Sequence, residues 1–446
     1  MSTRTAPTRC ELAATAERIF RAGLAAVDPE AAVRRALRLQ GDVLWLQSPG
    51  GREEPTSIDL SSLRRVLVVG GGKAGAPMVR ALEKLLGDRI DAGLVVVKEG
   101  HGRAPGEGSG RVSIREAAHP VPDAAGVSAT EELLALAAEA DAETLAICVL
   151  SGGGSALLTA PAGDISLADL QAVTSGLLGA GVDIRAINTV RKHLSQIKGG
   201  QLARALAPAR LVTLVLSDVI GDPLDAIASG PTVPDPTTFE DARRVLQEAG
   251  LWGHGRLPLA VQRHLEAGVA AEVSETPDAD DASFRGARQL LVANNRAALA
   301  ACEAEARALG YEPLVLSSTA EGEAKDLGRF LASVAREVRE RGRPAEPPLC
   351  VISGGEPTVT FADLARAGRG GRNQEMALAA ATSLEGLSGV VLLCAGTDGT
   401  DGPTDAAGAF AFGDTVRRAE AARRSCAAAL AGHDAYPLFE ALGDLL

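Results

Sequence analysis

The sequence of 446 residues is poor in aromatic side chains, has no long apolar run and has no cysteine spacing typical of a metal site. Aromatic residues make up 3%, whereas there are 50 glycines, a balance typical of an enzyme with many tight turns between strands and helices. No apolar stretch reaches ~18 residues, and the N-terminal segment lacks the apolar core of a signal peptide. The six scattered cysteines are expected to be reduced core residues. We therefore expect a soluble, cytoplasmic protein that does not interact with a membrane.

The charge balance is acidic and contains no dense basic stretch. Forty-five Lys and Arg residues stand against 57 Asp and Glu residues, which gives a net charge of −12. A protein that follows a phosphodiester backbone needs a basic patch, so nucleic acid is excluded as a partner. With 46% hydrophobic residues, the chain is long enough to form two domains.

Apolar runs alternate with helical patterns through most of the chain. Residues 9 to about 40 predict two amphipathic helices, interrupted at Asp28 and Pro29. Continuous apolar strands that alternate with helices predict a parallel sheet with helices on both faces, the α/β class. Strands are predicted at 66–69, 94–97, 145–150, 211–216, 290–293, 313–316, 349–352 and 390–394, and helices at 124–140, 186–206, 296–309, 323–341 and 372–384.

Two segments interrupt this alternation. Residues 221–238 are rich in Pro, Gly, Asp, Ser and Thr, and their length favours a functional loop or a crossover between domains. Residues 251 to about 286 are polar and weakly patterned. We therefore predict an N-terminal α/β domain at 1–250 and a second α/β domain at 251–446.

A glycine-rich loop follows the strand at 66–69 and precedes a helix. Its sequence is Gly70-Gly71-Gly72-Lys73-Ala74-Gly75, and in this context backbone N–H groups and the helix dipole bind phosphate groups. A dinucleotide-binding loop fits the same pattern, and Glu99 lies near the place of its ribose-binding acid. Lys73 favours phosphoryl transfer, because its ammonium can lie against phosphate oxygens. A purely structural turn with an exposed lysine remains an alternative.

Two further glycine-rich loops follow strands. The first contains Ser151, Gly152, Gly153, Gly154 and Ser155, and the second contains Ser353, Gly354, Gly355 and Glu356. At the carboxyl ends of parallel strands, such loops are expected to converge on one ligand crevice. Plain strand-to-helix turns are the alternative for each.

Basic and amide residues at two places suggest anion binding. Arg372 stands at the predicted start of a helix, followed by Asn373 and Glu375, and its guanidinium can form bidentate contacts with phosphate or carboxylate. The alternative is a helix cap with exposed arginines. The second place is one polar helical face, which is equally consistent with a solvated surface; it comprises Asn188, Arg191 and Lys192. The neighbouring His193 is expected to have a packing or surface role.

Acidic residues form two groups after predicted strands. Asp218 is followed by Asp222 and Asp225, and Asp398 is followed by Asp401 and Asp405. Carboxylates beside phosphate-binding loops commonly hold Mg²⁺ in phosphoryl transfer, so Asp218 and Asp398 are the candidate metal ligands. For the other acids, hydrogen bonding within glycine-rich turns is the alternative.

Together these segments resemble the class II glycerate kinases, the glycerate 2-kinases whose C-terminal part is the MOFRL domain. The resemblance runs from about residue 10 to the end of the chain. It rests on VVGGGKAGAP (68–77), EAAHPVPD (116–123), LSGGGSALL (150–158), NTVRKHLSQIKGGQLA (188–203), SDVIGDPLDAIASGPTVPDPTTF (217–239), SGGEPTV (353–359), GRGGRNQE (368–375) and GTDGTDGPTDAAGA (396–409). One departure is that the family sequence T-G-P-T-x-T-N-V, expected after AYPLFEALGDLL, does not follow here.

The resemblance implies two α/β/α domains, the N-terminal one Rossmann-like with a mainly parallel sheet, and an active site in the cleft between the domains. It implies ATP and Mg²⁺ as co-reactants, D-glycerate as acceptor and 2-phosphoglycerate as product. It also implies that Lys73 and Arg372 are the leading catalytic residues and that Asp218 and Asp398 belong to the site.

We expect Lys73, Arg372 and Mg²⁺ to neutralise the transferred phosphoryl group, in a monomer or homodimer. Asp218 or Asp398 either binds metal or orients the substrate hydroxyl, and Arg191 or Lys192 holds the glycerate carboxylate. Two alternatives stay open: an NAD(P)H-dependent hydroxypyruvate reductase and an inactive phosphometabolite-binding protein. The residues expected to bind substrate or nucleotide are Gly71, Gly72, Ser151, Gly152, Gly153, Gly154, Ser155, Asn188, Arg191, Lys192, Ser353, Gly354, Gly355, Glu356, Asn373 and Glu375.

Overall fold

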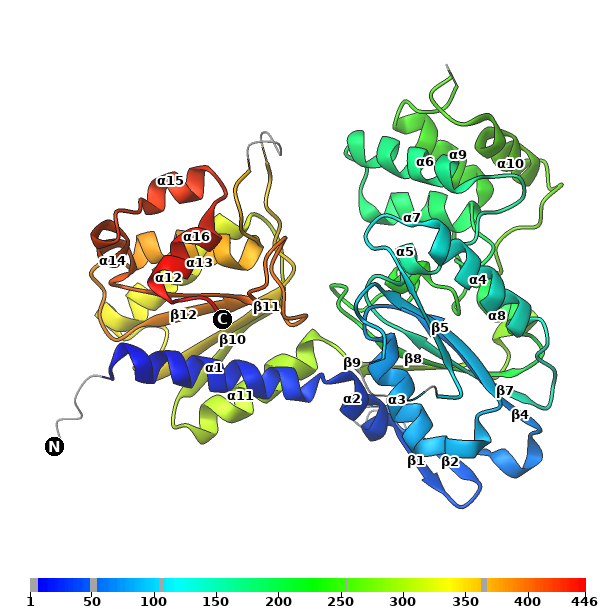
Figure 1. Ribbon diagram of the computed structural model, residues 1–446, viewed down its shortest axis with the longest axis horizontal. Helices are drawn as coiled ribbons and strands as arrows, with labels where there is room; N and C mark the ends of the chain where they lie inside the picture. Colours follow the sequence, from blue (N-terminus) through cyan, green and yellow to red (C-terminus); the bar gives the residue numbers. More distant parts are fainter. Residues whose placement is uncertain (1–6, 49–53, 104–107, 109, 254, 362–366) are drawn as a thin grey trace. The chain divides into compact units, whose positions relative to one another are not determined.

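The structure, a computed structural model, divides the chain into two compact units. It describes residues 7–48, 54–103, 108, 110–253, 255–361 and 367–446. The large unit is formed by Asp28–Asn294, and the small unit is formed by Met1–Val27 together with Asn295–Leu446. Figure 1 displays both units coloured along the chain. Each is an α/β structure, as the alternating pattern predicted.

A six-stranded parallel sheet is the centre of the large unit. Its strand order is β6-β5-β4-β7-β8-β9, and every neighbouring pair is parallel. The inner strands are continuous apolar runs; all seven residues of β7 are buried, as expected for a strand covered on both faces. The strand bounds are β4 (Arg65–Gly71), β5 (Ala92–Lys98), β6 (Ser113–Ala117), β7 (Thr144–Leu150), β8 (Arg210–Leu216) and β9 (Arg288–Ala293).

Helices cover both faces of this sheet. One group consists of α2 (Pro29–Ala36) and α3 (Gly75–Leu86), which pack on each other. The other group packs around β5 and β6 and consists of α4 (Ala124–Ala137), α5 (Gly154–Leu157) and α8 (Gln201–Leu206). The sheet is therefore the middle of three layers, which confirms the Rossmann-like arrangement expected for this part of the chain.

Four further helices of the large unit share an apolar core of their own (Figure 1). They are α6 (Leu167–Gly179), α7 (Ile184–His193), α9 (Phe239–Glu248) and α10 (Leu259–Val269). Helix α10 lies in a segment whose weak pattern suggested a boundary. It forms because Val261 and Leu265 are buried in this core.

The single helix expected over residues 186–206 is wrong, because the chain forms α7 and α8 with a break between them. Helix α7 ends at His193, and Gly199 and Gly200, with φ values of +56° and +79°, directly precede α8. The Ser195 hydroxyl accepts hydrogen bonds from the main-chain N–H groups of Ile197 and Lys198, at 3.2 and 3.3 Å. Tertiary packing thus overrides the helical pattern here.

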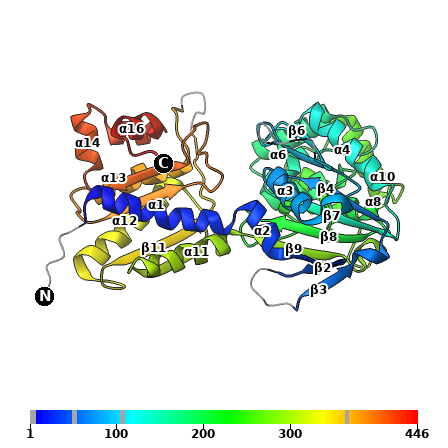
Figure 2. The same cartoon turned by 60° about the horizontal axis from the view of Figure 1, so that its bottom comes forward.

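Short strands were not foreseen. Strands β1 (Leu37–Gln40), β2 (Val43–Leu46) and β3 (Thr56–Asp59) form an antiparallel sheet beside α2 (Figure 2). Edge strand β6 was missed as well. Each of these strands has only four or five residues, too few for a clear alternation of apolar and polar positions.

The small unit contains two two-stranded sheets between helices. Strands β10 (Glu312–Ala320) and β11 (Leu349–Gly355) are parallel, whereas β12 (Val391–Ala395) and β13 (Gly408–Phe412) are antiparallel. Helices α1 (Arg9–Ala26) and α11 (Asn295–Ala308) lie side by side against the strands (Figure 1). The other helices are α12 (Ala324–Arg341), α13 (Arg372–Leu384), α14 (Thr415–Ala421), α15 (Cys426–Ala431) and α16 (Ala435–Leu442).

The division between the two compact units does not lie at residue 250, where the domain boundary was predicted. Strand β9 pairs with β8, so residues up to Asn294 belong to the large unit. Helix α1 instead packs on α11, which places the start of the chain in the small unit. Both facts depend on contacts between distant segments, which local sequence patterns do not report.

The cysteines are unpaired, and four of the six are buried: Cys148, Cys302, Cys394 and Cys426. Cys350 is half-buried, and Cys10 is exposed rather than in the core. In the part of the chain that the structure describes, no helix is long and apolar enough to cross a membrane.

Candidate functional site

The first two glycine-rich loops lie against each other because their strands are neighbours in the sheet. Strands β4 and β7 are paired in register, with Gly71 opposite Leu150. Beyond this pair, the N–H of Lys73 donates to the carbonyl oxygen of Gly152 at 2.9 Å. The N–H of Ala74 donates to the Ser151 hydroxyl oxygen at 3.0 Å. The loops therefore form one hydrogen-bonded structure at the carboxyl end of the sheet.

Gly72 has to be glycine for this contact to exist. Its φ is +141°, and a Cβ atom at this position would lie 2.2 Å from the hydroxyl oxygen of Ser151. Ser151 is 1% exposed and has no room to move away. The close approach of the two loops is therefore built into the glycine pattern.

Asp218 lies at the second loop. It follows β8, the strand next to β7, and its carboxylate is so close to Gly152 that a Cβ there would lie 1.9 Å from Oδ2. Asp218 is also an exposed residue. The structure thus brings together Lys73, Asp218 and the two glycine loops, which the sequence placed in three separate segments.

His119 is a residue of this site that the motif analysis did not single out. Its ring Cδ2 and the Cγ atom of Lys73 lie 3.0 and 3.3 Å from the position of a Cβ on Gly153. Burial, and then the charge of Lys73, lower the pKa of His119, which keeps the imidazole neutral near pH 7. The segment EAAHPVPD carried this histidine and was the signal that could have identified it.

A hydrogen-bonded chain connects the second loop to α7. The hydroxyl oxygens of Ser155 and Ser229 are 2.7 Å apart, and the Ser229 hydroxyl also donates to Oδ1 of Asn188 at 3.2 Å. Ser229 lies in the segment that was predicted to be a functional loop, with a φ of +60°. Asn188 is 5% exposed, so this helical face is packed inward, and the solvated-surface interpretation of it is wrong.

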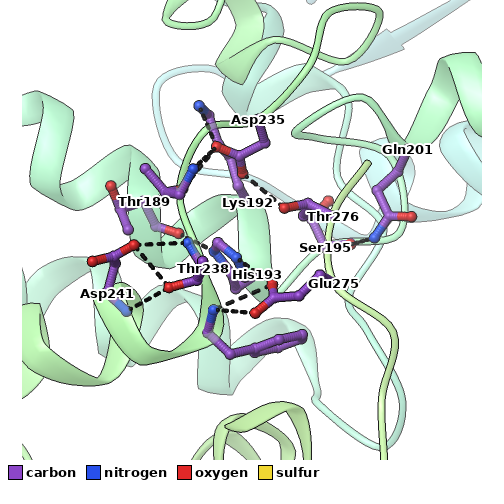
Figure 3. A network of polar contacts seen from close by, with 12 residues as sticks. Thr189, Lys192, His193, Ser195, Gln201, Asp235, Thr238, Asp241, Glu275 and Thr276 are labelled. Carbon is purple, nitrogen blue, oxygen red and sulfur yellow. Dashed lines mark hydrogen bonds and ion pairs between the residues drawn. The ribbon is translucent and has the colours of Figure 1, made fainter. Parts of the chain in front are cut away.

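Lys192 on the same helix has its charge balanced within the protein. Its Nζ lies 3.2 Å from Oδ1 of Asp235 and 3.7 Å from Oδ2 of Asp225. Figure 3 shows that Asp235 in turn binds the hydroxyl group of Thr276. His193 has the packing role that was expected, because it is buried with a 2.8 Å hydrogen bond between Nδ1 and the carbonyl oxygen of Thr189. This network anchors α7 to the loop that contains Asp235.

Two other basic residues of this segment, Arg191 and Lys198, have environments different from that of Lys192. Arg191 is half-buried, and burial lowers its pKa. Lys198, which no motif argument selected, is 5% exposed and donates from Nζ to the carbonyl oxygen of Leu158. Its only sequence signal is its place in NTVRKHLSQIKGGQLA, since a buried lysine cannot be told from an exposed one by residue type.

The third glycine-rich segment belongs to the small unit and to a different sheet. Ser353, Gly354 and Gly355 continue β11 and do not form a loop after it. The argument that three loops share the edge of one sheet therefore applies only to the first two. Glu356 follows β11, is exposed, and forms an ion pair through Oε1 with Nη1 of Arg372.

Helix α13 begins at Arg372, as predicted, and Asp401 caps its N-terminus. The N–H groups of Asn373 and Gln374 donate to the two carboxylate oxygens of Asp401, at 3.1 and 2.8 Å. Burial raises the pKa of Asp401, against the lowering effect of these hydrogen bonds. Asp401 thus has a structural role, but it caps a helix that lies earlier in the chain and the contact is not within a glycine-rich turn. Asn373, whose Nδ2 also donates to Asp401 at 2.9 Å, is committed to this cap.

The other predicted residues of the small unit are divided between its surface and its interior. Glu375 is 3% exposed and accepts a 2.7 Å hydrogen bond from Nδ1 of His433, whereas Asp398 is exposed. Among the described residues, no group of three or more His, Cys, Asp and Glu side chains is arranged to hold a metal ion by itself. A carboxylate such as Asp218 beside a glycine-rich loop has the chemistry that Mg²⁺ prefers, since this ion binds through one or two carboxylates together with phosphate oxygens.

Comparisons with known proteins identify two family regions along the chain. Residues 15–266 match a family described as a domain of unknown function (DUF4147), and residues 349–446 match the MOFRL family. A glycerate 2-kinase from Pyrococcus horikoshii is 39% identical over 429 residues, which cover 96% of this chain and 92% of the relative. This chain belongs to the glycerate kinase family that carries a MOFRL domain.

Two other similarities extend this result. A protein from Agrobacterium vitis, provisionally named a hydroxypyruvate reductase, is 41% identical over 96% of this chain and 89% of its own length. The crystal structure of a glycerate kinase from Thermotoga maritima superposes with a TM-score of 0.82 at 37% identity, covering 98% of this chain and 95% of that one. The α/β fold of this family is therefore the fold described above.

Proposed function

We propose that this chain transfers the γ-phosphoryl group of ATP to the 2-hydroxyl of D-glycerate, forming 2-phospho-D-glycerate. The observation that carries the proposal is the position of Lys73, in a glycine loop that hydrogen-bonds to a second glycine loop with Asp218 beside it. The N–H groups of residues 72–75 all donate within the protein. The ammonium group of Lys73 is therefore the donor that this loop offers to the transferred phosphoryl group, a role that lysine has in phosphoryl transfer. Family membership with glycerate kinases supports the acceptor.

Each residue has a role that follows from its chemistry. The ammonium group of Lys73 neutralises charge on the phosphoryl oxygens, and the guanidinium of Arg372 supplies planar N–H donors for phosphate. When bound, Mg²⁺ would neutralise phosphate charge, and Asp218 and Asp398 carry the oxygen donors that it prefers. Asp218 can instead accept a hydrogen bond from the substrate hydroxyl and orient it for in-line attack. Neutral His119 places no second positive charge beside Lys73.

A coupled assay of ADP release with ATP, Mg²⁺ and D-glycerate tests this proposal, with ³¹P NMR to identify the product. We expect ADP release that depends on D-glycerate, and the 2-phosphate as product. The 3-phosphate would contradict the assigned acceptor hydroxyl. The absence of ADP release from folded protein would contradict the kinase function altogether.

The second candidate is reduction of hydroxypyruvate by a nicotinamide cofactor. The observation that favours it is the location of Glu99 directly after β5, the parallel neighbour of β4, where dinucleotide-binding folds place a ribose-binding acid. It leaves Lys73 in the first loop without a role. Oxidation of NADH or NADPH that requires hydroxypyruvate, together with calorimetric binding of that cofactor but not of ATP, would favour this candidate over the kinase.

A further inference from the structure

Two cationic side chains of the large unit lie near each other without an acidic partner. Arg191 is close enough to Lys198 for its charge to lower the pKa of the lysine. Among the residues that the structure describes, no carboxylate forms an ion pair with either of them. Lys192, in the same segment, has two aspartates close to its Nζ. The contrast is sharp, because the protein supplies carboxylates to one buried lysine and not to the other.

A buried cation without an acidic partner is energetically unfavourable, and burial lowers its pKa. Removing an ammonium group from water costs several kcal/mol unless an anion or hydrogen bonds replace the solvent. Burial, and then the charge of Arg191, lower the pKa of Lys198 to about 7. Among the described residues, its one hydrogen-bond partner is the carbonyl oxygen of Leu158, which satisfies one donor of three. An anion placed at Lys198 and Arg191 would restore the charged form.

The pair is located beside the second glycine loop. Asn188 and Arg191 are three residues apart on α7 and therefore share a face, and Asn188 is connected to Ser155 through the hydroxyl of Ser229. Leu158, which accepts the hydrogen bond from Lys198, is the residue that ends α5, the short helix that starts at this loop. Two cations and two serine hydroxyl groups thus lie close to the loop that is proposed to serve the reaction.

We propose that Arg191 and Lys198 form the anion subsite that binds the carboxylate of the hydroxy-acid substrate, an inference that rests on the proposed kinase function. The subsite selects a small carboxylic acid over the corresponding alcohol or ester. Lys192, which the sequence offered as an equal candidate, is already neutralised by aspartates.

Few charged side chains surround Lys198. Helix α5 and the short helix Ile227–Ser229, whose Ser229 carbonyl accepts a hydrogen bond from Gly199, carry no titratable side chain. On α8, Arg204 is paired with Asp281. Asp235 and Lys192 lie beside the neighbouring Gly199 and are paired with each other. Arg191 on α7 is the charge that lowers the pKa of Lys198, and binding of an anion is expected to be coupled to protonation of this lysine.

Isothermal titration of D-glycerate in two buffers of different ionisation enthalpy tests this coupling, with and without a non-hydrolysable ATP analogue. At pH 8 the unliganded lysine is mostly neutral, because its pKa is about 7, and binding requires the charged form. We expect uptake of close to one proton per D-glycerate bound, and affinity that weakens as pH rises above 7. Glycerol, which has no carboxylate, should cause no proton uptake.

Two variants separate the proposed role from a structural one. Lys198→Arg keeps a charge at all pH values, so it should bind D-glycerate without taking up a proton. Lys198→Met should raise the KM for D-glycerate by roughly tenfold to a hundredfold, as expected for the loss of a charged hydrogen bond, with little change in the KM for ATP. Proton uptake that persists in Lys198→Arg, or an equal rise of both KM values in Lys198→Met, would overturn the proposal.

The kinase function and the subsite can fail independently. If the wild-type protein binds D-glycerate with proton uptake but releases no ADP, the subsite stands and the proposed function fails. If it phosphorylates D-glycerate without proton uptake on binding, the function stands and the subsite is wrong. Because the calorimetric test uses the wild-type protein, poor folding of Lys198→Met would not prevent the decision.

Discussion

The N–H group of Lys73 donates a 2.9 Å hydrogen bond to the carbonyl oxygen of Gly152, so the first glycine loop is held by the second. The bond fixes the backbone from which the lysine side chain starts. A flexible ammonium group on a fixed backbone loses less conformational entropy when it binds phosphate. The pairing of β4 with β7 is what brings the two loops within reach of each other.

Replacement of Lys73 by alanine should lower kcat by roughly a hundredfold or more while the fold is preserved, because the charge that stabilises the transferred phosphoryl group is removed. The backbone hydrogen bond to Gly152 does not involve the side chain and should remain. The matched control is Lys84→Ala. Lys84 is an exposed residue of α3, the helix that follows the loop, and it is paired with Glu30 of α2. The coupled ADP assay and circular dichroism measure both variants.

We expect Lys84→Ala to keep kcat within about twofold, since exposed ion pairs contribute little. Lys73→Ala with kcat within a few-fold of wild type would remove Lys73 from the mechanism.

Replacement of Gly72 by alanine should destabilise the large unit by about 3 kcal/mol or more. A Cβ at Gly72 would overlap the Ser151 hydroxyl, and the φ of +141° is unfavourable for alanine. Both tryptophans of the chain, Trp45 and Trp252, belong to the large unit, so urea unfolding followed by tryptophan fluorescence reports this unit specifically.

Gly87→Ala is the control for this prediction. Gly87 also has a positive φ, +55°, but nothing lies within 4 Å of an added Cβ. Its ψ is −125°, outside the left-handed helical region, so the substitution should cost about 1–3 kcal/mol for the backbone conformation alone. Equal losses for the two variants would mean that the contact with Ser151 contributes nothing.

Replacement of Arg372 should affect catalysis more than folding. Its ion pair with Glu356 is partly exposed, so the loss of stability in Arg372→Ala should stay below about 1 kcal/mol. The kcat should fall by roughly a hundredfold, and Arg372→Lys should recover only part of it because a lysine lacks the planar fork. Kinetic assays and thermal unfolding provide the measurements.

Arg369→Ala offers a comparison within the same motif. The Arg369 guanidinium lies 4.3 Å from the centre of the Tyr436 ring, a contact that accounts for this residue without a ligand. It should retain near-normal kcat. A comparable loss in Arg369→Ala, or full activity of Arg372→Lys, would argue against a specific bidentate role for Arg372.

His119 should make the large unit sensitive to acid. Its pKa is lowered in the folded protein, so the unfolded state binds a proton more readily once the pH falls below about 6.5. The contribution of His119 to stability is therefore present above that pH and is lost as the pH falls through the folded-state value. The difference in unfolding free energy between wild type and His119→Gln should be larger at pH 8 than at pH 5, measured by tryptophan fluorescence in urea.

The Lys73→Met background tests the cause of this effect. Lys73 is the charge that contributes most after burial itself, so its removal should reduce the pH dependence assigned to His119. A difference between wild type and His119→Gln that does not change with pH would show that the imidazole titrates normally.

Much of the fold followed from the sequence because its signals are local. Helix α13 has the predicted bounds 372–384, and the eight predicted strands all exist, since each is a continuous apolar run next to a recognisable turn. The glycine loops and Lys73 were likewise identified from local patterns, as were Asp218 and Arg372. Family resemblance added the acceptor, which no local pattern contains.

Only the tertiary structure decided the contacts between distant segments. Asp401 caps α13, and Lys192 is neutralised by Asp235, although neither pair is close in sequence. The predicted helix over residues 186–206 is interrupted between His193 and Gln201, a stretch that includes the positive φ values of Gly199 and Gly200.

The first glycine loop illustrates the division most clearly. From the sequence, its glycines matched both a dinucleotide pattern and a kinase pattern, and Lys73 favoured the kinase. The structure adds Asp218 and His119 near Lys73. It also places Arg191 near Lys198, with no carboxylate paired to either within the described part of the chain. Local patterns determine where a chain turns and which groups it carries. Burial and charge pairing arise only from the folded packing of remote segments, and they determine which of those groups remain available to a ligand.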